Sequence, residues 1–260
     1  MNKIAEVFAK EKKVFIPFIT AGDPSLEKTE EMIYAMEKAG AGIIEIGIPF
    51  SDPVAEGPVI QEADLRALAA GCKTDKIFAM LKRVRQNTKV PLVFLTYINP
   101  IFTYGCDKFF KNCRDCDING VIIPDVPFEE KGEVAEYCKK YEVDLISLIA
   151  PTSEQRIKMI ARDAAGYIYL VSSLGVTGVR TTITTDIGAI VEQIRQVTKV
   201  PIAVGFGIAT PEQAEKMAKI SDGAIVGSAI VKIVAANGDN CVKPVADYVR
   251  TMVEAVATCR

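Results

Sequence analysis

The chain has 260 residues, of which 49% are hydrophobic and 25% charged, so it can bury a sizeable core and remain soluble. Its net charge of −2, with no basic block or stripe, argues against nucleic acid as a partner. The charged N-terminus lacks a signal-peptide pattern and no apolar run approaches the ~20 residues that span a bilayer. We therefore expect no membrane partner and a cytoplasmic protein, or a plastid-type stroma if a transit peptide has been removed.

Short β-branched runs alternate with helical patterns along the chain, after an extra N-terminal helix. The runs are near-continuously hydrophobic, as expected of a parallel sheet covered on both faces. They predict strands at 14–20, 42–48, 90–97, 120–126, 143–149, 167–173, 200–206 and 223–228. The patterns between and after them predict helices at 25–39, 58–70, 75–87, 107–116, 129–141, 153–163, 184–197, 211–219 and 243–257.

Eight strand-then-helix units in a chain of this length indicate an α/β fold, the (β/α)8 TIM barrel. The same four residues, Thr-Lys-Val-Pro, enter the third and the seventh strand, which supports repetition. Because no linker or shift in composition divides the chain, we expect a single domain over 1–260. The other fold considered, an open doubly wound sheet, is less favoured because the sequence has no obvious dinucleotide fingerprint.

The second strand carries an acid in the middle of an apolar run. Ile44, Ile46 and Ile48 share one face of this strand, and Glu45 lies on the other. If the isoleucines pack on the outer helices, Glu45 points into the barrel, where burial raises a carboxyl pKa toward neutrality. The alternative is a buried salt bridge, but no predicted strand has an interior Lys or Arg. We interpret Glu45 as a proton-transfer group.

The loop after this strand, "PFSDPVAEGP", adds Asp52 and Glu56. In a barrel, catalytic residues gather at the C-terminal ends of the strands and in the loops that follow them. Either acid also fits a helix cap or a solvated loop charge. Asp125 lies at such a position, at the end of the fourth strand. Tyr169 shares one face of the sixth strand with Tyr167, where a tyrosine is more often part of the core.

Glycine-rich loops follow the last three strands. "SSLGVTGVRTTITTD" (172–186) has the composition of a mobile lid, whereas "GFGIATP" and "GSAIV" each begin a helix. Backbone N–H groups at such a helix N-terminus form the phosphate site common in barrels. Tight turns that need positive φ are the alternative explanation of these glycines.

Missing residue types restrict the chemistry further. The chain has no His, which excludes a Ser-His-Asp triad and any His-ligated metal. Seven irregularly spaced cysteines suit free thiols in a reducing compartment, and the pair Cys113 and Cys116 has no second pair to complete a zinc site. The residues therefore indicate a barrel enzyme without a metal, which uses carboxylates for acid–base chemistry on a small phosphorylated substrate.

Eight segments in order give the chain a specific resemblance. They are "FITAGDPS", "EIGIPFSDPVAEGPVIQ", "TYINPIFTYG", "DVPFEE", "IAPTS", "VSSLGVTGVR", "VGFGIATPEQA" and "IVGSAIVKIV". Over essentially its whole length the sequence resembles the tryptophan synthase alpha subunit family. This resemblance implies a lyase of tryptophan biosynthesis that cleaves indole-3-glycerol phosphate to indole and glyceraldehyde 3-phosphate. It also implies an α2β2 heterotetramer in which the β subunit receives the indole and holds the pyridoxal phosphate, so that this chain needs no cofactor of its own.

The resemblance also assigns roles to residues of this sequence. Glu45 matches the proton shuttle, Glu56 the second carboxylate, which contacts the indole nitrogen, and Tyr169 an active-site tyrosine. Asp125 matches an acid that transmits signals between subunits, Asp52 becomes a loop-shaping or interface residue, and loops 52–60 and 97–105 would face the β subunit. The positions that match substrate contacts are Phe18, Leu95, Ile149 and Phe206 around the indole, Thr177 on the lid, and Gly178, Gly207, Gly227 and Ser228 around the phosphate.

One position departs from the family pattern. The usual A-D-G-P of this loop is here Ala55-Glu56-Gly57-Pro58, so the second carboxylate carries one more methylene. This departure leaves an alternative, in which the chain is a weakened subunit that mainly binds and activates the β subunit. A third reading, an indole-glycerol-phosphate synthase, would need an inward strand lysine that no strand run offers.

Overall fold

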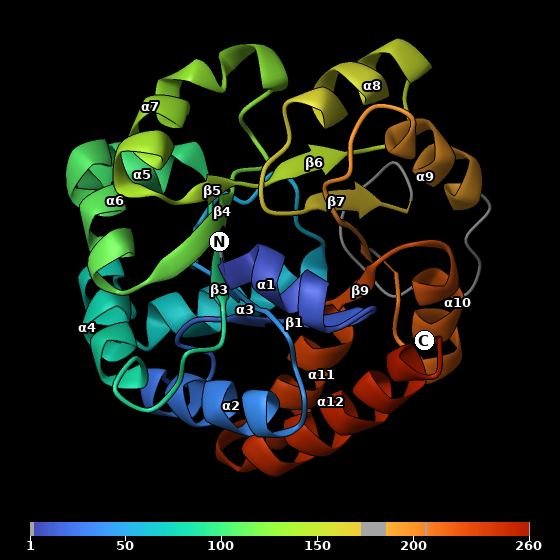
Figure 1. Cartoon of the computed structure of the whole chain (residues 1–260). Coiled ribbons are helices and arrows are strands. Elements are labelled where there is room, and N and C mark those ends of the chain that lie inside the picture. Colours follow the sequence, from blue (N-terminus) through green and yellow to red (C-terminus); the bar gives the residue numbers. More distant parts are fainter. Residues whose placement is uncertain (1–2, 173–185, 206, 260) are drawn as a thin grey trace.

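The computed structural model of the chain describes residues 3–172, 186–205 and 207–259 (Figure 1). Its strands are β1 (Val14–Thr20), β2 (Ile44–Gly47), β3 (Leu92–Leu95), β4 (Ile118–Ile122), β5 (Asp144–Leu145), β6 (Ser147–Ile149), β7 (Ile168–Val171), β8 (Ile202–Gly205) and β9 (Gly223–Val226). Its α-helices are α1 (Lys3–Lys10), α2 (Leu26–Lys38), α3 (Pro58–Ala69), α4 (Thr74–Val84), α5 (Ile98–Tyr104), α6 (Cys106–Asp115), α7 (Gly132–Tyr141), α8 (Glu154–Arg162), α9 (Ile187–Arg195), α10 (Pro211–Ile220), α11 (Ser228–Asn237) and α12 (Val242–Ala257). Two short 3-10 helices, Phe128–Glu130 and Gly238–Asn240, complete the set.

The strands form one parallel sheet in the order β5-β4-β3-β2-β1-β9-β8-β7-β6. β5 and β6 are two pieces of one extended segment, separated only by Ile146, whose N–H donates to the carbonyl of Val121 at 2.9 Å. The two ends of the sheet therefore meet at this segment, and the sheet curls into a barrel with helices outside it (Figure 1). This confirms the predicted (β/α)8 TIM barrel.

The barrel wall separates two hydrophobic layers. Ile44, Ile46 and Ile48 of the second strand segment pack in the outer layer, under the helices, whereas Ile43 belongs to the layer inside the barrel. This alternation is the one that the sequence predicts for the segment. Each fully buried aliphatic side chain contributes roughly 1.5–3 kcal/mol, so these two layers supply most of the free energy that favours the fold. The inner layer consists of Ile4, Val14, Ile16, Ile43, Val93, Ile122, Ile146, Tyr167, Tyr169, Val171, Ala203 and Ile225.

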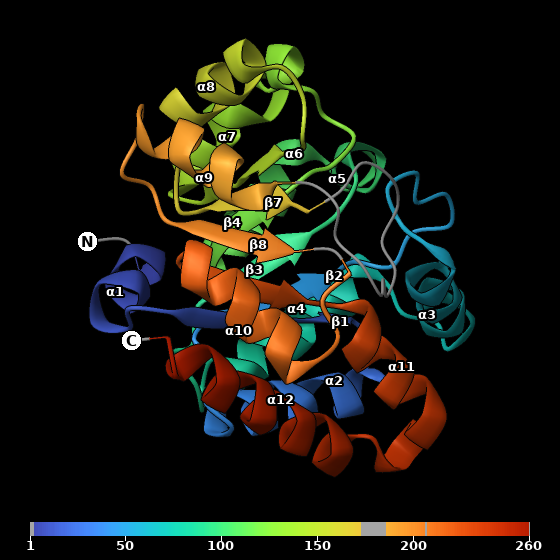
Figure 2. The ribbon, with the colours of Figure 1, turned by 90° about the vertical axis from the view of Figure 1, so that its right-hand side faces the viewer.

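Helix α1 closes the N-terminal end of the barrel. Its Ile4 is fully buried in the inner layer, and the ring of Phe8 lies 6.2 Å from the ring of Tyr167, measured between centroids. Figure 1 shows α1 lying across the centre of the barrel, and Figure 2 shows it at the opposite end from α3. With this end covered, substrate access is left to the opposite end, where the strand C-termini lie.

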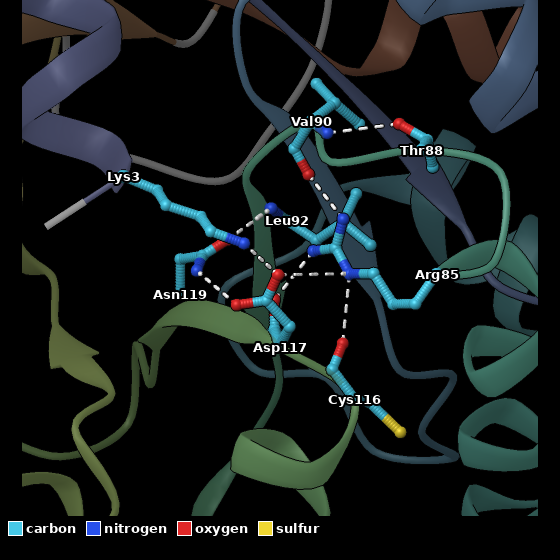
Figure 3. Close-up of polar contacts among 8 residues, drawn as sticks. All are labelled: Lys3, Arg85, Thr88, Val90, Leu92, Cys116, Asp117 and Asn119. Atoms are coloured by element: carbon cyan, nitrogen blue, oxygen red, sulfur yellow. Dashed lines mark hydrogen bonds and ion pairs between the residues drawn. The ribbon is translucent and has the colours of Figure 1, made fainter.

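A polar cluster stabilises the turns at the closed end (Figure 3). The guanidinium of Arg85 donates to the carbonyl oxygens of Cys116 (3.0 Å), Val90 (2.6 Å) and Asp117 (2.6 Å). Asp117 has a left-handed backbone (φ 53°), and its carboxylate pairs with Arg85 at 3.8 Å and with Lys3 of α1. Arg85 thus ties the end of α4 to the turn before β4, and Lys3 attaches α1 to the same turn.

Replacing Arg85 with Ala is expected to lower the free energy of unfolding by about 3 kcal/mol, because three backbone carbonyls lose their donor in a mostly buried site. Urea denaturation followed by circular dichroism measures this loss. The matched control is Lys108→Ala, which breaks an exposed ion pair with Asp75 and a cation–π contact with the ring of Tyr104, and should cost about 1 kcal/mol. Equal losses in the two variants would contradict the structural role of Arg85.

The structure differs from the sequence prediction in three elements. Residues 97–105, expected as a loop, contain helix α5, and the fifth strand is split at Ile146. The fourth strand ends at Ile122, so Asp125 lies in the turn after it. Within the part of the chain that the structure describes, no helix combines the length and the apolar character needed to cross a membrane.

Candidate active site

Glu45 lies inside the barrel, as the strand pattern predicts. In the parallel register it stands beside Phe18 of β1 and Val93 of β3, and Val93 belongs to the inner layer. Only 1% of Glu45 is exposed. The hydroxyl of Tyr167 in the loop before β7 donates to Glu45 Oε1 at 2.5 Å. The sequence placed Tyr167 on the same strand face as Tyr169 but gave no sign that it would meet Glu45.

Burial sets the protonation state of Glu45. Loss of solvent raises the pKa of its carboxyl from 4.5 to about 8, and the charge of Glu56 acts in the same direction. The hydrogen bond from Tyr167 opposes this rise, because it favours the charged form. At neutral pH the main form of Glu45 is therefore the protonated acid, which can give a proton and take one back.

Glu56 is buried although it comes from the loop between β2 and α3, with 4% of the residue exposed. The backbone on both sides of it is held. Ala55 N–H donates to the hydroxyl of Tyr97 at 3.1 Å, and the amide of Gln61 donates to the carbonyl of Glu56 at 2.7 Å. The extra methylene therefore does not carry the carboxylate out to solvent. Its charge acts on Glu45, which places the two carboxyls in one site.

Tyr169 of β7 joins this pair. Burial, together with the charges of Glu45 and Glu56, holds the pKa of Tyr169 well above its usual value, so the phenol stays protonated. A Cβ added to Gly205 would lie 2.4 Å from the Tyr169 hydroxyl oxygen, which shows that the ring lies directly on the backbone of β8. Gly205 is thus required by the tyrosine beside it rather than by a turn.

The ring of Phe18 also lies directly against the backbone of glycine residues. A Cβ on Gly47 would lie 2.6 Å from the Phe18 ring, and one on Gly227 would lie 3.2 Å from it. Phe18 packs with Ile60 of α3 and with Leu95 at the end of β3. These side chains form an apolar wall beside Glu45, as expected for the aromatic part of a substrate.

The prediction for Ile149 differs from the structure. Ile149 is fully buried in the outer layer and aligns with Leu170, whereas its neighbour Leu148 aligns with Tyr169 and packs against the inner layer. Side chains of a strand alternate between its two faces, so only one of the two neighbours can face the site. Leu148 is the apolar residue that β6 presents to the interior, and Ile149 packs in the outer layer, on the side where α8 contacts β6.

The N-terminus of α11 is a candidate anion site, because no side chain in the described part of the chain caps it. Its N-cap residue is Gly227, which has no side chain to accept the first N–H groups, and Ser228 begins the helix. Helix α10 is different, because Thr210 and Gln213 form a capping box that satisfies its N-terminus from within. The ten-residue helix α11 thus offers backbone donors and the positive end of its dipole to an anion.

Of the other residues predicted to contact the substrate, one lies within the described part of the chain and three lie outside it. Gly207 has φ 80°, a conformation that glycine adopts without strain. Thr177, Gly178 and Phe206 lie outside the described residues, so their predicted roles stay predictions.

Two acids named from the sequence lie away from the buried pair. Asp52 is exposed and accepts a hydrogen bond from the Ser51 hydroxyl at 2.5 Å, which suits a loop-shaping or interface residue. The carboxylate of Asp125 accepts the N–H of Ile98 at 3.1 and 3.2 Å and so links the turn after β4 to the start of α5. The described residues include no group of three or more His, Cys, Asp or Glu arranged to hold a metal ion.

The parallel barrel, the protonated buried acid and the uncapped helix N-terminus together indicate the class of barrel enzymes that perform acid–base chemistry on an anionic substrate. Comparison with known families makes this specific. The model of the family described as tryptophan synthase alpha chain matches residues 4–257. The chain therefore belongs to the tryptophan synthase alpha chain family, which is a family of lyases.

Individual relatives agree with this assignment. The tryptophan synthase alpha chain of Lacticaseibacillus casei is 54% identical over 235 residues, which cover 90% of this chain and 88% of the relative. A crystal structure of the alpha chain from Legionella pneumophila has a TM-score of 0.88 at 35% identity and covers 98% of this chain and 97% of that one. A structure from Pyrococcus furiosus, titled as the tryptophan synthase a2b2 complex, has a TM-score of 0.85 at 32% identity and covers 93% and 98%.

Proposed function

We propose that this chain is a carbon–carbon lyase that cleaves indole-3-glycerol phosphate into indole and glyceraldehyde 3-phosphate. The observation that carries the proposal is the buried pair of carboxyls, Glu45 in the barrel and Glu56 in the loop above it, of which Glu45 is held in its acid form. A retro-aldol cleavage of this kind needs one group that moves a proton and a second that stabilises positive charge.

The steps assign one role to each carboxyl. Protonated Glu45 gives its proton to C3 of the indole, and the positive charge that spreads to the ring nitrogen is stabilised by the carboxylate of Glu56. The Glu45 carboxylate then takes the proton of the C3′ hydroxyl. The C3–C3′ bond breaks, its electron pair returns to the ring, and the aldehyde forms. Glu45 is protonated again at the end, so no net proton is consumed.

The surrounding residues suit the two ends of the substrate. Phe18, Leu95 and Leu148 supply apolar surface for the indole, and Tyr169 borders both carboxyls. The phosphate would bind the N–H groups at Gly227 and Ser228, with Gly207 beside them, through the helix dipole and backbone donors. We propose that the reaction needs no cofactor of this chain's own.

The partner that we propose is a tryptophan synthase β subunit, in an α2β2 heterotetramer that passes indole to tryptophan synthesis. Two large apolar side chains stand exposed on the segments expected to meet it, Val54 (73% exposed) in the loop that carries Glu56 and Phe102 (48%) on α5. Exposed apolar residues of this kind favour an interface. Asp125 touches α5 at Ile98, so it could transmit movement between this surface and the barrel. The seven free thiols support a cytoplasmic location.

A cleavage assay tests this function. The purified chain, alone and with the β subunit from the same source, is given indole-3-glycerol phosphate, and indole and glyceraldehyde 3-phosphate are measured. We expect slow release of both products by the chain alone and much faster release by the complex. Release of neither product by the complex would contradict the lyase. Activation of the β subunit without any cleavage would instead support the weakened-subunit alternative, which the family comparisons do not favour.

A further inference from the structure

Helix α3 carries a carboxylic acid on its buried face. Ile60, Ala63 and Ala67 form the apolar stripe of this helix at helical spacing, and Asp64 lies in the same stripe with 5% of the residue exposed. An isolated ionised carboxylate is unfavourable in such surroundings, so this group needs either a cation or a bound proton. The proposed cleavage steps make no use of it.

The nearest charges to Asp64 in the described part of the chain do not supply a cation. Burial raises the pKa of Asp64 to about 8, and the negative charges of Glu56 and Asp23 act in the same direction. The guanidinium of Arg66 is engaged by Asp23, to which it donates two hydrogen bonds of 2.8 Å. The uncharged phenol of Tyr97 is the other titratable group within electrostatic reach, and α11 packs against α3 through the apolar side chain of Val231.

Asp64 also touches the loop that presents Glu56. Its carboxyl accepts the backbone N–H of Phe50, at the point where the chain leaves β2. The far end of the loop is fixed by the hydrogen bond from Ala55 to Tyr97, and the ring of Phe50 lies 5.5 Å from the ring of Tyr97. Asp64 and Tyr97 therefore hold the two ends of one short segment, and Glu56 follows directly after it.

We propose that Asp64 is a positioning residue for Glu56. Asp64 keeps its own proton, anchors the start of the loop and leaves Glu56 as the ionised member of the pair. Two carboxyls in one buried site resist ionising together, so a proton fixed on Asp64 favours the charge on Glu56. This inference rests on the proposed lyase function, in which that charge stabilises the indole ring. When Asp64 ionises in alkaline solution, its charge opposes that of Glu56 and activity falls.

The test compares the pH dependence of kcat/KM for indole-3-glycerol phosphate in the complex with the β subunit. Asp64→Asn keeps an oxygen for the N–H of Phe50 but cannot ionise, whereas Asp64→Ala removes the anchor as well. Glu62→Gln is the matched control, an acid-to-amide change at an exposed position of the same helix. Circular dichroism establishes that each variant is folded, and Asp64→Asn remains informative if Asp64→Ala does not fold.

In the wild type, both Glu45 and Asp64 must keep their protons, so log kcat/KM should fall with a slope of about −2 above the two pKa values. Asp64→Asn should reduce this slope to about −1 and stay within about threefold of the wild type at neutral pH, while Asp64→Ala should lose about tenfold or more. Glu62→Gln should follow the wild-type profile.

If the wild-type complex is active, either of two results would overturn the positioning role of Asp64 while leaving the proposed lyase function intact. One is an alkaline slope in Asp64→Asn that equals the wild-type slope, and the other is a loss at neutral pH as large in Asp64→Asn as in Asp64→Ala. A wild-type complex that cleaves no substrate would instead overturn the proposed function, and this positioning role with it.

Discussion

Glu45→Gln is expected to lower kcat for indole-3-glycerol phosphate cleavage by about 10²- to 10⁴-fold, the usual contribution of one general acid–base group. Glutamine keeps the shape and polarity of the side chain but can neither give a proton to C3 nor take one from the hydroxyl. The value of KM should change little, because the apolar wall and the anion site are untouched. Single-turnover measurements on the complex with the β subunit separate this loss from product release.

A second variant tests whether Glu45 acts as the acid. The hydrogen bond from Tyr167 lowers the pKa of Glu45, so Tyr167→Phe should raise that pKa further. In the Asp64→Asn background, where Glu45 alone titrates, this change should move the alkaline limb of the pH–rate profile to higher pH. A limb that stays in place or moves to lower pH would contradict the assignment. Loss of activity in Glu45→Gln without any shift in Tyr167→Phe would leave Glu45 essential but not as the titrating group.

The same pKa shift has a consequence for stability. The pKa of Glu45 in the folded chain, about 8, is above its ordinary value of 4.5, so the folded state binds this proton more tightly than the unfolded state. The stabilisation from the bound proton is complete below the ordinary value and is lost as pH rises through the folded value. Between pH 4.5 and about pH 8, the free energy of unfolding should therefore fall more steeply with pH for the wild type than for Glu45→Gln. Denaturation curves recorded at several pH values measure this difference.

Glu56→Gln is expected to lower kcat/KM by about 10²-fold or more, because it removes the negative charge that faces the ring nitrogen in the transition state. The neutral amide still accepts a hydrogen bond, so binding of the substrate should weaken less than turnover. Steady-state kinetics of the complex measure both effects. Unchanged turnover in Glu56→Gln would contradict the role of this carboxylate.

Glu56→Asp is the companion variant, since it restores the residue more usual in the family. Because Glu56 is already buried and its backbone is held by Gln61, we expect the shorter acid to change kcat/KM by less than about tenfold in either direction. A sharp rise in activity would show that the extra methylene has disabled the native chain. That result would favour a subunit that mainly docks to and activates its partner.

The strands show where sequence reasoning succeeds and where it fails. In the second strand a single acid among isoleucines marks the inner face, and the alternation of side chains then places Glu45 inside the barrel. The predicted strand that holds Leu148 and Ile149 has a polar residue on each face, because Asp144 alternates in step with Leu148 and Ser147 in step with Ile149. The alternation therefore does not single out a buried face of this strand. The prediction of Ile149 came from the family resemblance, and in the structure Ile149 packs in the outer layer.

Asp64 had a signal that local reasoning could have used. It lies at helical spacing from Ile60 and Ala67, on the stripe that must be buried, and an acid on such a stripe is unusual. What the spacing does not contain is the identity of the groups that meet it. Asp23 and Glu56 reach it only because the turn after β1 and the loop after β2 converge over α3.

The eightfold repeat, the inward direction of Glu45 and the family could all be predicted without a structure, because they follow from periodicity and from motifs that lie within single elements. The contacts that these side chains make depend on how distant elements pack together. Tyr167 and Glu45 are 122 residues apart in the chain, yet closure of the sheet brings the phenol to the carboxylate. The raised pKa of Glu45 is likewise a property of the closed barrel, since only closure removes the water that would stabilise its charge.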